Sequence, residues 1–154
     1  MPSLVAIAVG SNLGDRRAHV EWAFDRLREH LGDFQASTII ETEPADVPDP
    51  QPRYLNAVVT GRTELEPAAL IQLLLALEHE RGRTRVTPRA ARTLDLDLIL
   101  YGDRIIQSPG VDVPHPRFRE RRFVLQPLAE IAPDLRDPIT GRTARELLEG
   151  LAGT

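Results

Sequence analysis

Short apolar runs and alternating stretches predict four β-strands in the first hundred residues. Residues 4–9 form a continuous apolar run that stops at a Gly-Ser-Asn turn signal, as a buried strand does. Residues 35–42 are rich in β-branched side chains, which favour strands. Residues 53–62 and 92–100 alternate between two faces, and this period of two is the spacing of side chains along a strand.

Two helices are predicted between these strands. From Asp15 to Leu31 the apolar residues recur at helical spacing, and Gly32 is expected to cap that helix at its C-terminus. Pro67 is expected to begin a second helix, because proline is favoured at the first helical position, and Gly82 to end it. The buried stripe of this second helix is expected to be Leu70, Leu73, Leu74 and Leu77.

Beyond residue 100 the pattern predicts shorter elements. Gly102-Asp103 signals a hairpin whose return strand is residues 104–107. The two prolines of residues 113–116 favour an extended chain there. Residues 123–128 form a further apolar segment, and residues 143–151 a short final helix.

The order strand-helix-strand-strand-helix-strand is typical of an α+β fold with a ferredoxin-like β-α-β-β-α-β core. Such a core has a mainly antiparallel sheet with helices packed on one side, and the last third of the chain is expected to extend it. A length of 154 residues fits one domain, residues 1–154.

The composition is that of an ordinary globular chain, but its charges are unevenly placed. The net charge of −4 argues against general nucleic-acid binding. All 19 basic residues are arginine, and nine of them stand in two windows, residues 81–92 and 117–122. A locally basic site on an acidic chain fits a small anionic ligand better than a duplex. No apolar run approaches the roughly 18 residues of a membrane span, and no signal peptide is indicated, so a cytoplasmic location without membrane contact is expected.

Asp95 and Asp97 are the strongest sign of chemistry in the chain. In the predicted strand they share one face, while the other face carries Leu94, Leu96, Leu98 and Leu100. Because aspartate is disfavoured inside strands, two on one face need a reason. Paired carboxylates beside an arginine-rich segment can hold Mg²⁺ together with a polyphosphate. The alternative is a half-exposed strand whose carboxylates are simply solvated.

Other candidate residues lie near a proline-rich segment. Residues 43–52 contain four prolines, which exclude a helix or a central strand, so an exposed loop is predicted that is either functional or a plain surface connection. Tyr54 and Asn56 follow it on one face of the next strand. Taken singly, Tyr54 and Phe123 could be half-buried aromatics, and His115 a packed surface histidine.

Five short motifs in order resemble one family, 6-hydroxymethyl-7,8-dihydropterin pyrophosphokinase. They span residues 10–125, and any one of them alone would be weak evidence. The motifs are Gly10-Ser11-Asn12-Leu13-Gly14-Asp15, Tyr54-Leu55-Asn56-Ala57, Arg92-Thr93-Leu94-Asp95-Leu96-Asp97, Val113-Pro114-His115-Pro116-Arg117 and Arg121-Arg122-Phe123-Val124-Leu125.

The resemblance implies an enzyme of folate biosynthesis. It would transfer pyrophosphate from ATP to the hydroxymethyl group of 6-hydroxymethyl-7,8-dihydropterin and leave AMP. Tyr54 and Phe123 would sandwich the pterin ring, as flat rings stack on flat heterocycles. The further pterin contacts that the resemblance implies are Gly10, Thr42, Ala45 and Asn56.

The resemblance also implies a nucleotide site. Asp95 and Asp97 would bind two Mg²⁺ ions together with ATP, and Arg83 and Arg92 would join them as catalytic residues. The implied ATP contacts are Glu78, Arg83, Arg85, Arg92, Leu98, His115 and Arg121. No residue has an obvious general-base role, so catalysis is expected from positioning and electrostatics. The chain is expected to be a monomer, and its expected partners are small molecules, ATP and 6-hydroxymethyl-7,8-dihydropterin.

One segment departs from the family pattern. The family usually carries Trp-Gly-Pro just before Arg-Thr-Leu-Asp, where this chain has Pro88-Arg89-Ala90-Ala91. In the family this loop closes over ATP, and losing a large aromatic weakens any seal against water. The departure keeps a second hypothesis open, a non-catalytic ferredoxin-like module that binds a nucleotide or pterin. A third, a metal-free structural partner protein, is disfavoured by the arginines beside Asp95 and Asp97.

Overall fold

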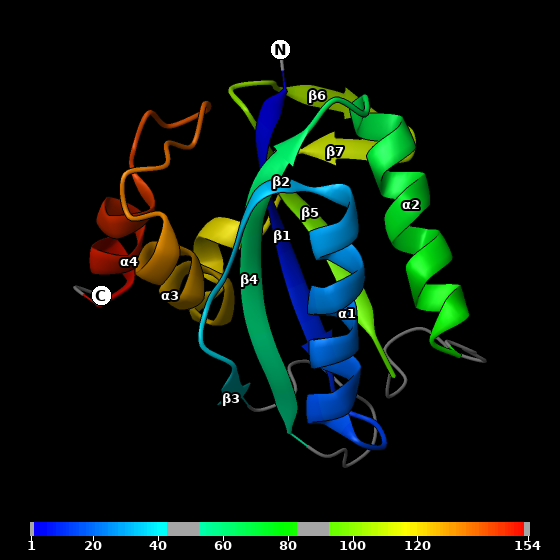
Figure 1. Ribbon diagram of the computed structural model, residues 1–154. Coiled ribbons are helices and arrows are strands. Elements are labelled where there is room, and N and C mark those ends of the chain that lie inside the picture. Colours follow the sequence, from blue (N-terminus) through cyan, green and yellow to red (C-terminus); the bar gives the residue numbers. More distant parts are fainter. Residues whose placement is uncertain (1, 43–52, 83–92, 153–154) are drawn as a thin grey trace.

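A central sheet lies between two pairs of helices in the computed structural model, which describes residues 2–42, 53–82 and 93–152 (Figure 1). Helices α1 (Arg16–His30) and α2 (Pro67–Glu80) cover one face, as predicted. The C-terminal extension adds α3 (Arg122–Ile131) and α4 (Ala144–Ala152) on the other face. None of the described helices is long and apolar enough to cross a membrane.

The sheet has the ferredoxin-like order β2-β4-β1-β5. The short strand β3 also pairs with β4, at residues 54–56, whereas β2 pairs with residues 59–62. Every one of these pairs is antiparallel, so the predicted fold class is confirmed. The strands are β1 (Ser3–Ser11), β2 (Gly32–Ala36), β3 (Ile40–Thr42), β4 (Tyr54–Thr63) and β5 (Asp95–Tyr101).

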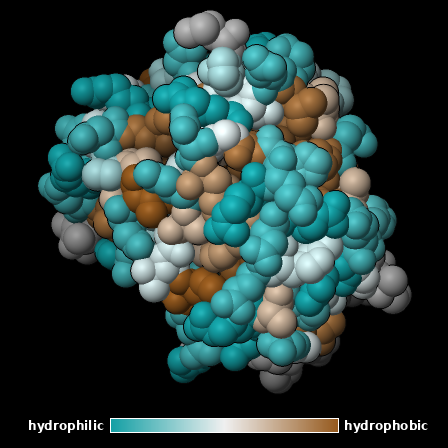
Figure 2. Space-filling view, viewed as in Figure 1, coloured by the Kyte–Doolittle hydropathy of each residue, from teal (hydrophilic) through white to brown (hydrophobic). Residues whose placement is uncertain are grey.

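Both faces of the sheet are buried against apolar side chains. Successive residues of β4 belong to different clusters: Val59 faces α1 and α2, and Val58 faces α3 and α4. Figure 2, drawn from the same side as Figure 1, shows a mostly hydrophilic surface with small apolar patches. The second cluster ends where polar residues replace apolar ones on the α3 face of β4 and β5, at Asn56 and Asp97.

The predicted strand 35–42 is in fact two strands. Ser37 interrupts it, because the Ser37 hydroxyl accepts a hydrogen bond from the Val58 backbone N–H at 2.9 Å in place of a ladder carbonyl. Thr38 then turns away from the sheet, and its N–H and hydroxyl both donate to the Glu130 carboxylate of α3.

The predicted cap at Gly32 is also wrong, because α1 runs directly into β2. Leu31 ends the helix in an extended conformation, and Gly32 already pairs with Arg62 in the sheet. The position that sterically requires a glycine is Gly61 instead. A Cβ on Gly61 would stand 2.7 Å from the Leu31 Cβ, so the link between α1 and β2 requires a bare backbone there.

A register shift in β5 changes which leucines share a face. Leu98 is opposite Ile7 and Leu100 is opposite Ala6, so Ile99 is an extra residue in β5. Leu94, Leu96 and Leu98 lie in the core under α1 and α2, as predicted. The prediction for Leu100 is wrong, because the bulge turns this side chain into the core under α3 and α4.

The predicted hairpin after β5 is wrong in its pairing. Gly102 makes a tight turn with a φ of 54°, but its N–H donates to the Leu4 carbonyl, and the chain leaves the sheet. The return strand is β6 (Ile106–Ser108), which pairs with β7 (Val111–Val113) and not with β5. A 3₁₀ turn, η1 (Phe118–Glu120), then leads to α3. The predicted final helix is confirmed as α4.

Contacts of His19 join the end of α2 to α1. The Arg81 Nε donates to the His19 Nδ1 at 2.8 Å, and the Arg81 guanidinium lies 5.1 Å from the ring centroid of the half-buried Trp22. Burial chiefly, and then the charge of Arg81, lower the pKa of His19 from its ordinary 6.5. The folded chain therefore favours neutral His19. The stability that this provides is present above pH 6.5 and is lost as the pH falls through the lowered value.

We therefore expect that His19→Gln reduces the loss of unfolding free energy between pH 7 and pH 5. Glutamine keeps an acceptor for Arg81 but cannot take up a proton. Urea unfolding at the two pH values measures the effect, and His30→Gln, an exposed position on the same helix, is the matched control. An unchanged pH dependence in His19→Gln would contradict the linkage.

Candidate functional site

Strand pairing brings three of the predicted site residues into one row. Gly10 on β1 is opposite Asp95 on one side and Asn56 on the other. Directly opposite residues of antiparallel strands point to the same face, so Asp95 and Asn56 flank Gly10 at two strand spacings, roughly 10 Å apart. Asp97 lies one step along the same face, opposite Ala8. This face is the one that α3 covers further along the sheet.

Gly10 leaves room between two side chains of β4. A Cβ at this position would lie 3.0 Å from the Asn56 Oδ1 and 3.6 Å from the Tyr54 Cδ1. The Asn56 amide is buried, and its Nδ2 donates to the Thr42 hydroxyl, which fixes how the amide is turned. Thr42 is itself opposite Tyr54 in the sheet. An aromatic ring, an amide and a bare stretch of backbone therefore adjoin at this position.

The two carboxylates fit a cation that arrives with other oxygen ligands. Asp95 and Asp97 are half-buried on one face of β5. The described part of the chain contains no group of three or more side chains able to hold a metal. Mg²⁺ commonly takes one or two carboxylates and completes its sphere with water and substrate phosphates. The residues present therefore suit Mg²⁺ bound together with a polyphosphate.

Glu78 has a position that sequence reasoning did not predict. It is 2% exposed at the end of α2, and its Oε2 accepts a hydrogen bond from the Leu96 backbone N–H at 2.7 Å. Leu96 stands between Asp95 and Asp97, so Glu78 fixes the segment that presents both carboxylates. Leu98, a predicted ATP contact, lies in the core under α1 and α2. The roles of Glu78 and Leu98 toward ATP remain predictions.

Glu78→Ala should destabilise the fold by about 1–3 kcal/mol, because it leaves the Leu96 N–H buried without this acceptor. Glu80→Ala is the matched control two residues further along α2, where the carboxylate pairs with Arg26 at the surface. Urea unfolding should show a much smaller change for that control. Equal stability of Glu78→Ala and the unchanged chain would mean that the buried carboxylate does not hold β5.

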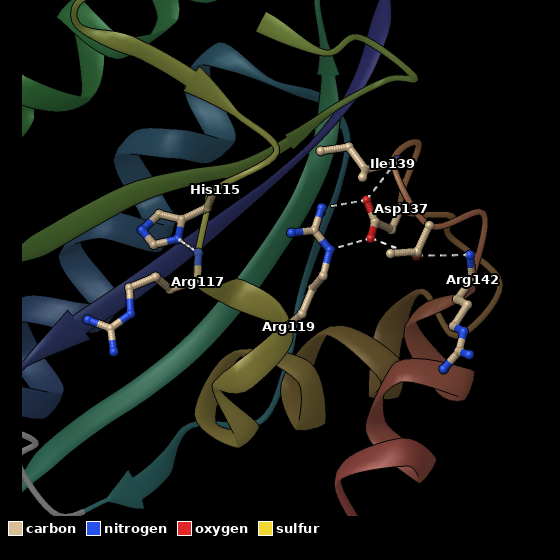
Figure 3. Close-up of polar contacts among 7 residues, drawn as sticks. His115, Arg117, Arg119, Asp137, Ile139 and Arg142 are labelled. Atoms are coloured by element: carbon tan, nitrogen blue, oxygen red, sulfur yellow. Dashed lines mark hydrogen bonds and ion pairs between the residues drawn. The ribbon is translucent and has the colours of Figure 1, made fainter. Parts of the chain in front are cut away.

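His115 lies beside β5 and close to charged groups of both signs. Its backbone N–H donates to the Ile99 carbonyl at 2.9 Å, and its Nδ1 accepts from the Arg117 N–H at 3.1 Å (Figure 3). Burial chiefly, and then the charge of Arg121, lower the pKa of His115, while Asp112 and Asp95 act in the opposite direction. His115 is therefore within electrostatic reach of both a carboxylate of β5 and an arginine of the basic window.

Arg121 and Phe123 stand where α3 begins. Arg121 is the N-cap residue, and its guanidinium lies 5.6 Å from the centroid of the Phe123 ring. Phe123 is half-buried against the core that α3 and β4 share. Two carboxylates and an amide therefore share the α3 face of the sheet, a histidine is bonded to β5, and an arginine and an aromatic ring stand at the start of α3. Such a set can hold a flat heterocycle and an anionic tail.

Four predicted site residues, Ala45, Arg83, Arg85 and Arg92, lie outside the described residues. Sequence reasoning assigned no role to Ser11 and Asn12, although both are fully buried at the end of β1. The signal for them was present, since two polar residues follow directly on an apolar strand within one of the recognised motifs.

Comparisons with known proteins agree on one family. Residues 6–133 match the family described as 7,8-dihydro-6-hydroxymethylpterin-pyrophosphokinase (HPPK). The chain is 40% identical to a 2-amino-4-hydroxy-6-hydroxymethyldihydropteridine pyrophosphokinase of Pseudomonas aeruginosa, over 94% of this chain and 89% of that protein. It is 52% identical to the Synechocystis protein of the same name over 65% of this chain, and the matched part is about half, 51%, of that relative.

Solved structures show the same fold in longer chains. A crystal structure of HPPK-DHPS in complex with substrates has a TM-score of 0.79 at 12% identity, covering 97% of this chain and 43% of that one. Wild-type HPPK-DHPS of Plasmodium falciparum has a TM-score of 0.75 at 13% identity, covering 99% and 45%. This chain therefore corresponds in fold to less than half of each of those chains.

Proposed function

Because this chain belongs to the 7,8-dihydro-6-hydroxymethylpterin-pyrophosphokinase family, we propose that it transfers pyrophosphate from ATP to 6-hydroxymethyl-7,8-dihydropterin. The match confirms the resemblance predicted from the five motifs. The structural observation that carries the proposal is the row Asp95, Gly10, Asn56 across three strands. It supports the proposal because Asp95 could hold a phosphate-bound cation while the groups around Gly10 and Asn56 could hold a flat ring, as a transfer between two such substrates requires.

In this proposal the pterin binds beside Gly10, in a slot between Tyr54 and Phe123. Tyr54 and Phe123 stack on the two faces of the ring, and the Asn56 amide hydrogen-bonds its edge, held in place by the Thr42 hydroxyl. Backbone groups at Thr42 and Ala45 complete the contacts. The hydroxymethyl arm then points along the row toward Asp95.

The β5 end of the row binds the triphosphate. Asp95 and Asp97 would hold two Mg²⁺ ions, which would supply positive charge against the triphosphate. His115 and Arg121 contact phosphate oxygens from the α3 side, and Arg83, Arg85 and Arg92 from the basic window. The substrate hydroxyl attacks the β-phosphorus. The new bond joins this oxygen to the β-phosphorus, the bond from the β-phosphorus to the α-phosphate oxygen breaks to release AMP, and the hydroxyl proton passes to water.

A direct assay tests the proposal. The protein is mixed with Mg²⁺, ATP and 6-hydroxymethyl-7,8-dihydropterin, and AMP is followed with time. We expect AMP in proportion to added pterin and none when pterin or Mg²⁺ is omitted. Binding of both substrates without AMP would favour the non-catalytic module, the alternative suggested by the sequence Pro88-Arg89-Ala90-Ala91. A cytoplasmic location, a monomeric state and one domain over residues 1–154 also remain predictions.

A further inference from the structure

The turn η1 separates two of the proposed phosphate contacts. His115 precedes it and Arg121 follows it, and within the turn the N–H groups of Phe118, Glu120 and Arg121 each donate to the carbonyl three positions back. Such bonds fix the shape of a turn but not its place on the protein. Its place must come from contacts to other elements.

Two side chains of η1 reach distant parts of the chain: Phe118 is buried in the core under α3 and α4, and Arg119 forms an ion pair. Arg119 forms a forked pair with Asp137 in the turn between α3 and α4, with the second guanidinium nitrogen 2.8 Å from Oδ1 (Figure 3). The same guanidinium lies 4.8 Å from the ring centroid of the buried Phe118. A fork onto a carboxylate fixes direction as well as distance, so this pair orients the turn.

Asp137 is built into its own turn as a rigid acceptor. Its side chain is fully buried, and it also accepts from the Ile139 N–H at 3.0 Å and the Thr140 hydroxyl at 2.8 Å. Its backbone N–H donates to the Arg142 carbonyl, and its carbonyl accepts from the Gly141 N–H. Burial alone would raise the pKa of Asp137, but the hydrogen bonds from Arg119, Thr140 and Ile139 outweigh it and lower that pKa.

We propose that Asp137, acting through Arg119, is a positioning residue that holds η1 so that His115 and Arg121 both face the carboxylates of β5. This inference rests on the proposed function, because it concerns nucleotide binding at the same site. Asp137 touches no substrate. Its effect is on the spacing between two groups that bind the triphosphate, and it should therefore appear in affinity for ATP.

Asp137→Asn tests the inference, because asparagine keeps the size of the side chain and removes the charge that orients Arg119. We expect the dissociation constant for Mg²⁺-ATP, measured by equilibrium titration, to rise about tenfold, since small misplacements of binding groups have effects of this order. The KM for ATP should rise in parallel, with kcat changed much less. Circular dichroism at the assay temperature checks that the variant is folded.

Arg119→Lys serves if Asp137→Asn does not fold, because lysine keeps the charge beside Asp137 but loses the fork, and the same rise in the ATP dissociation constant is expected. The matched control is Asp134→Asn, an exposed partner of Arg145 in the same turn, which should leave ATP affinity unchanged. Unchanged ATP affinity in the folded variants, or a loss of kcat alone, would overturn the inference. The protein without substitutions separates the proposed transfer from the positioning role of Asp137. If it binds ATP without making AMP, the proposed transfer is wrong, and the effect of Asp137 on ATP affinity can still be measured.

Discussion

Asp97→Asn should lower the rate of AMP formation by about three orders of magnitude while leaving the fold intact. Asparagine matches aspartate in size, and position 97 is half-buried opposite Ala8, so the sheet can accommodate it. The variant loses the negative charge that binds a cation, and a bound metal ion is typically worth several kcal/mol of barrier. The assay is AMP release at saturating pterin over a range of Mg²⁺ concentrations.

The matched control for this variant is Asp103→Asn. Asp103 is exposed in the turn that follows β5, so the same chemical change there should alter neither rate nor stability. Thermal unfolding of both variants separates loss of function from loss of fold. AMP formation by Asp97→Asn at the rate of the unchanged chain would remove Asp97 from the proposed metal site.

The fold was predictable where the apolar pattern is unambiguous. The alternation in β4 and the apolar run of β1, which a turn signal ends, both favour strands, and pairing the elements in order leads to the ferredoxin-like core. The bulge in β5 was not predictable, because Leu98, Ile99 and Leu100 are all apolar and either face would accept them. Pattern arguments fail where neighbouring residues are chemically alike.

The errors at β2, β3 and β6 have a common physical cause. Ser37 ends β2 because its hydroxyl pairs with Val58, and at Gly102 the N–H still bonds to Leu4 of β1 while the positive φ turns the chain out of β5. Both bonds join residues that are far apart in sequence. Local propensity cannot predict them, since it describes only what a segment prefers in isolation.

The same distinction between local and long-range contacts applies to the site. Asp95 and Asp97 are two residues apart on one strand, so their shared face follows from the sequence alone. The row with Gly10 and Asn56 depends on the register of two strand pairs, which only the structure gives. The contacts of Glu78 to Leu96 and of Arg119 to Asp137 each span 18 residues, and no spacing rule points to them.

Phe123→Ala should weaken pterin binding by a factor of about 10–100, because stacking of a base-like ring on an aromatic side chain contributes about 1–3 kcal/mol. Phe123 lies in the first turn of α3, with one side against the core and the Arg121 guanidinium near its ring. Truncation removes one wall of the proposed slot and leaves Tyr54, Asn56 and the β5 carboxylates in place. Equilibrium titration with the pterin measures the effect.

The alternative explanation is that Phe123 is a half-buried aromatic whose removal only loosens the molecule. Phe24→Ala separates the two, because Phe24 is also half-buried but packs on the opposite core, with its ring 6.4 Å from that of Phe34. Both variants should lose stability by cavity formation, while only Phe123→Ala should lose pterin affinity. Equal pterin affinity in the two variants would show that the ring of Phe123 does not contact the substrate, and the slot would then have to be closed by another element.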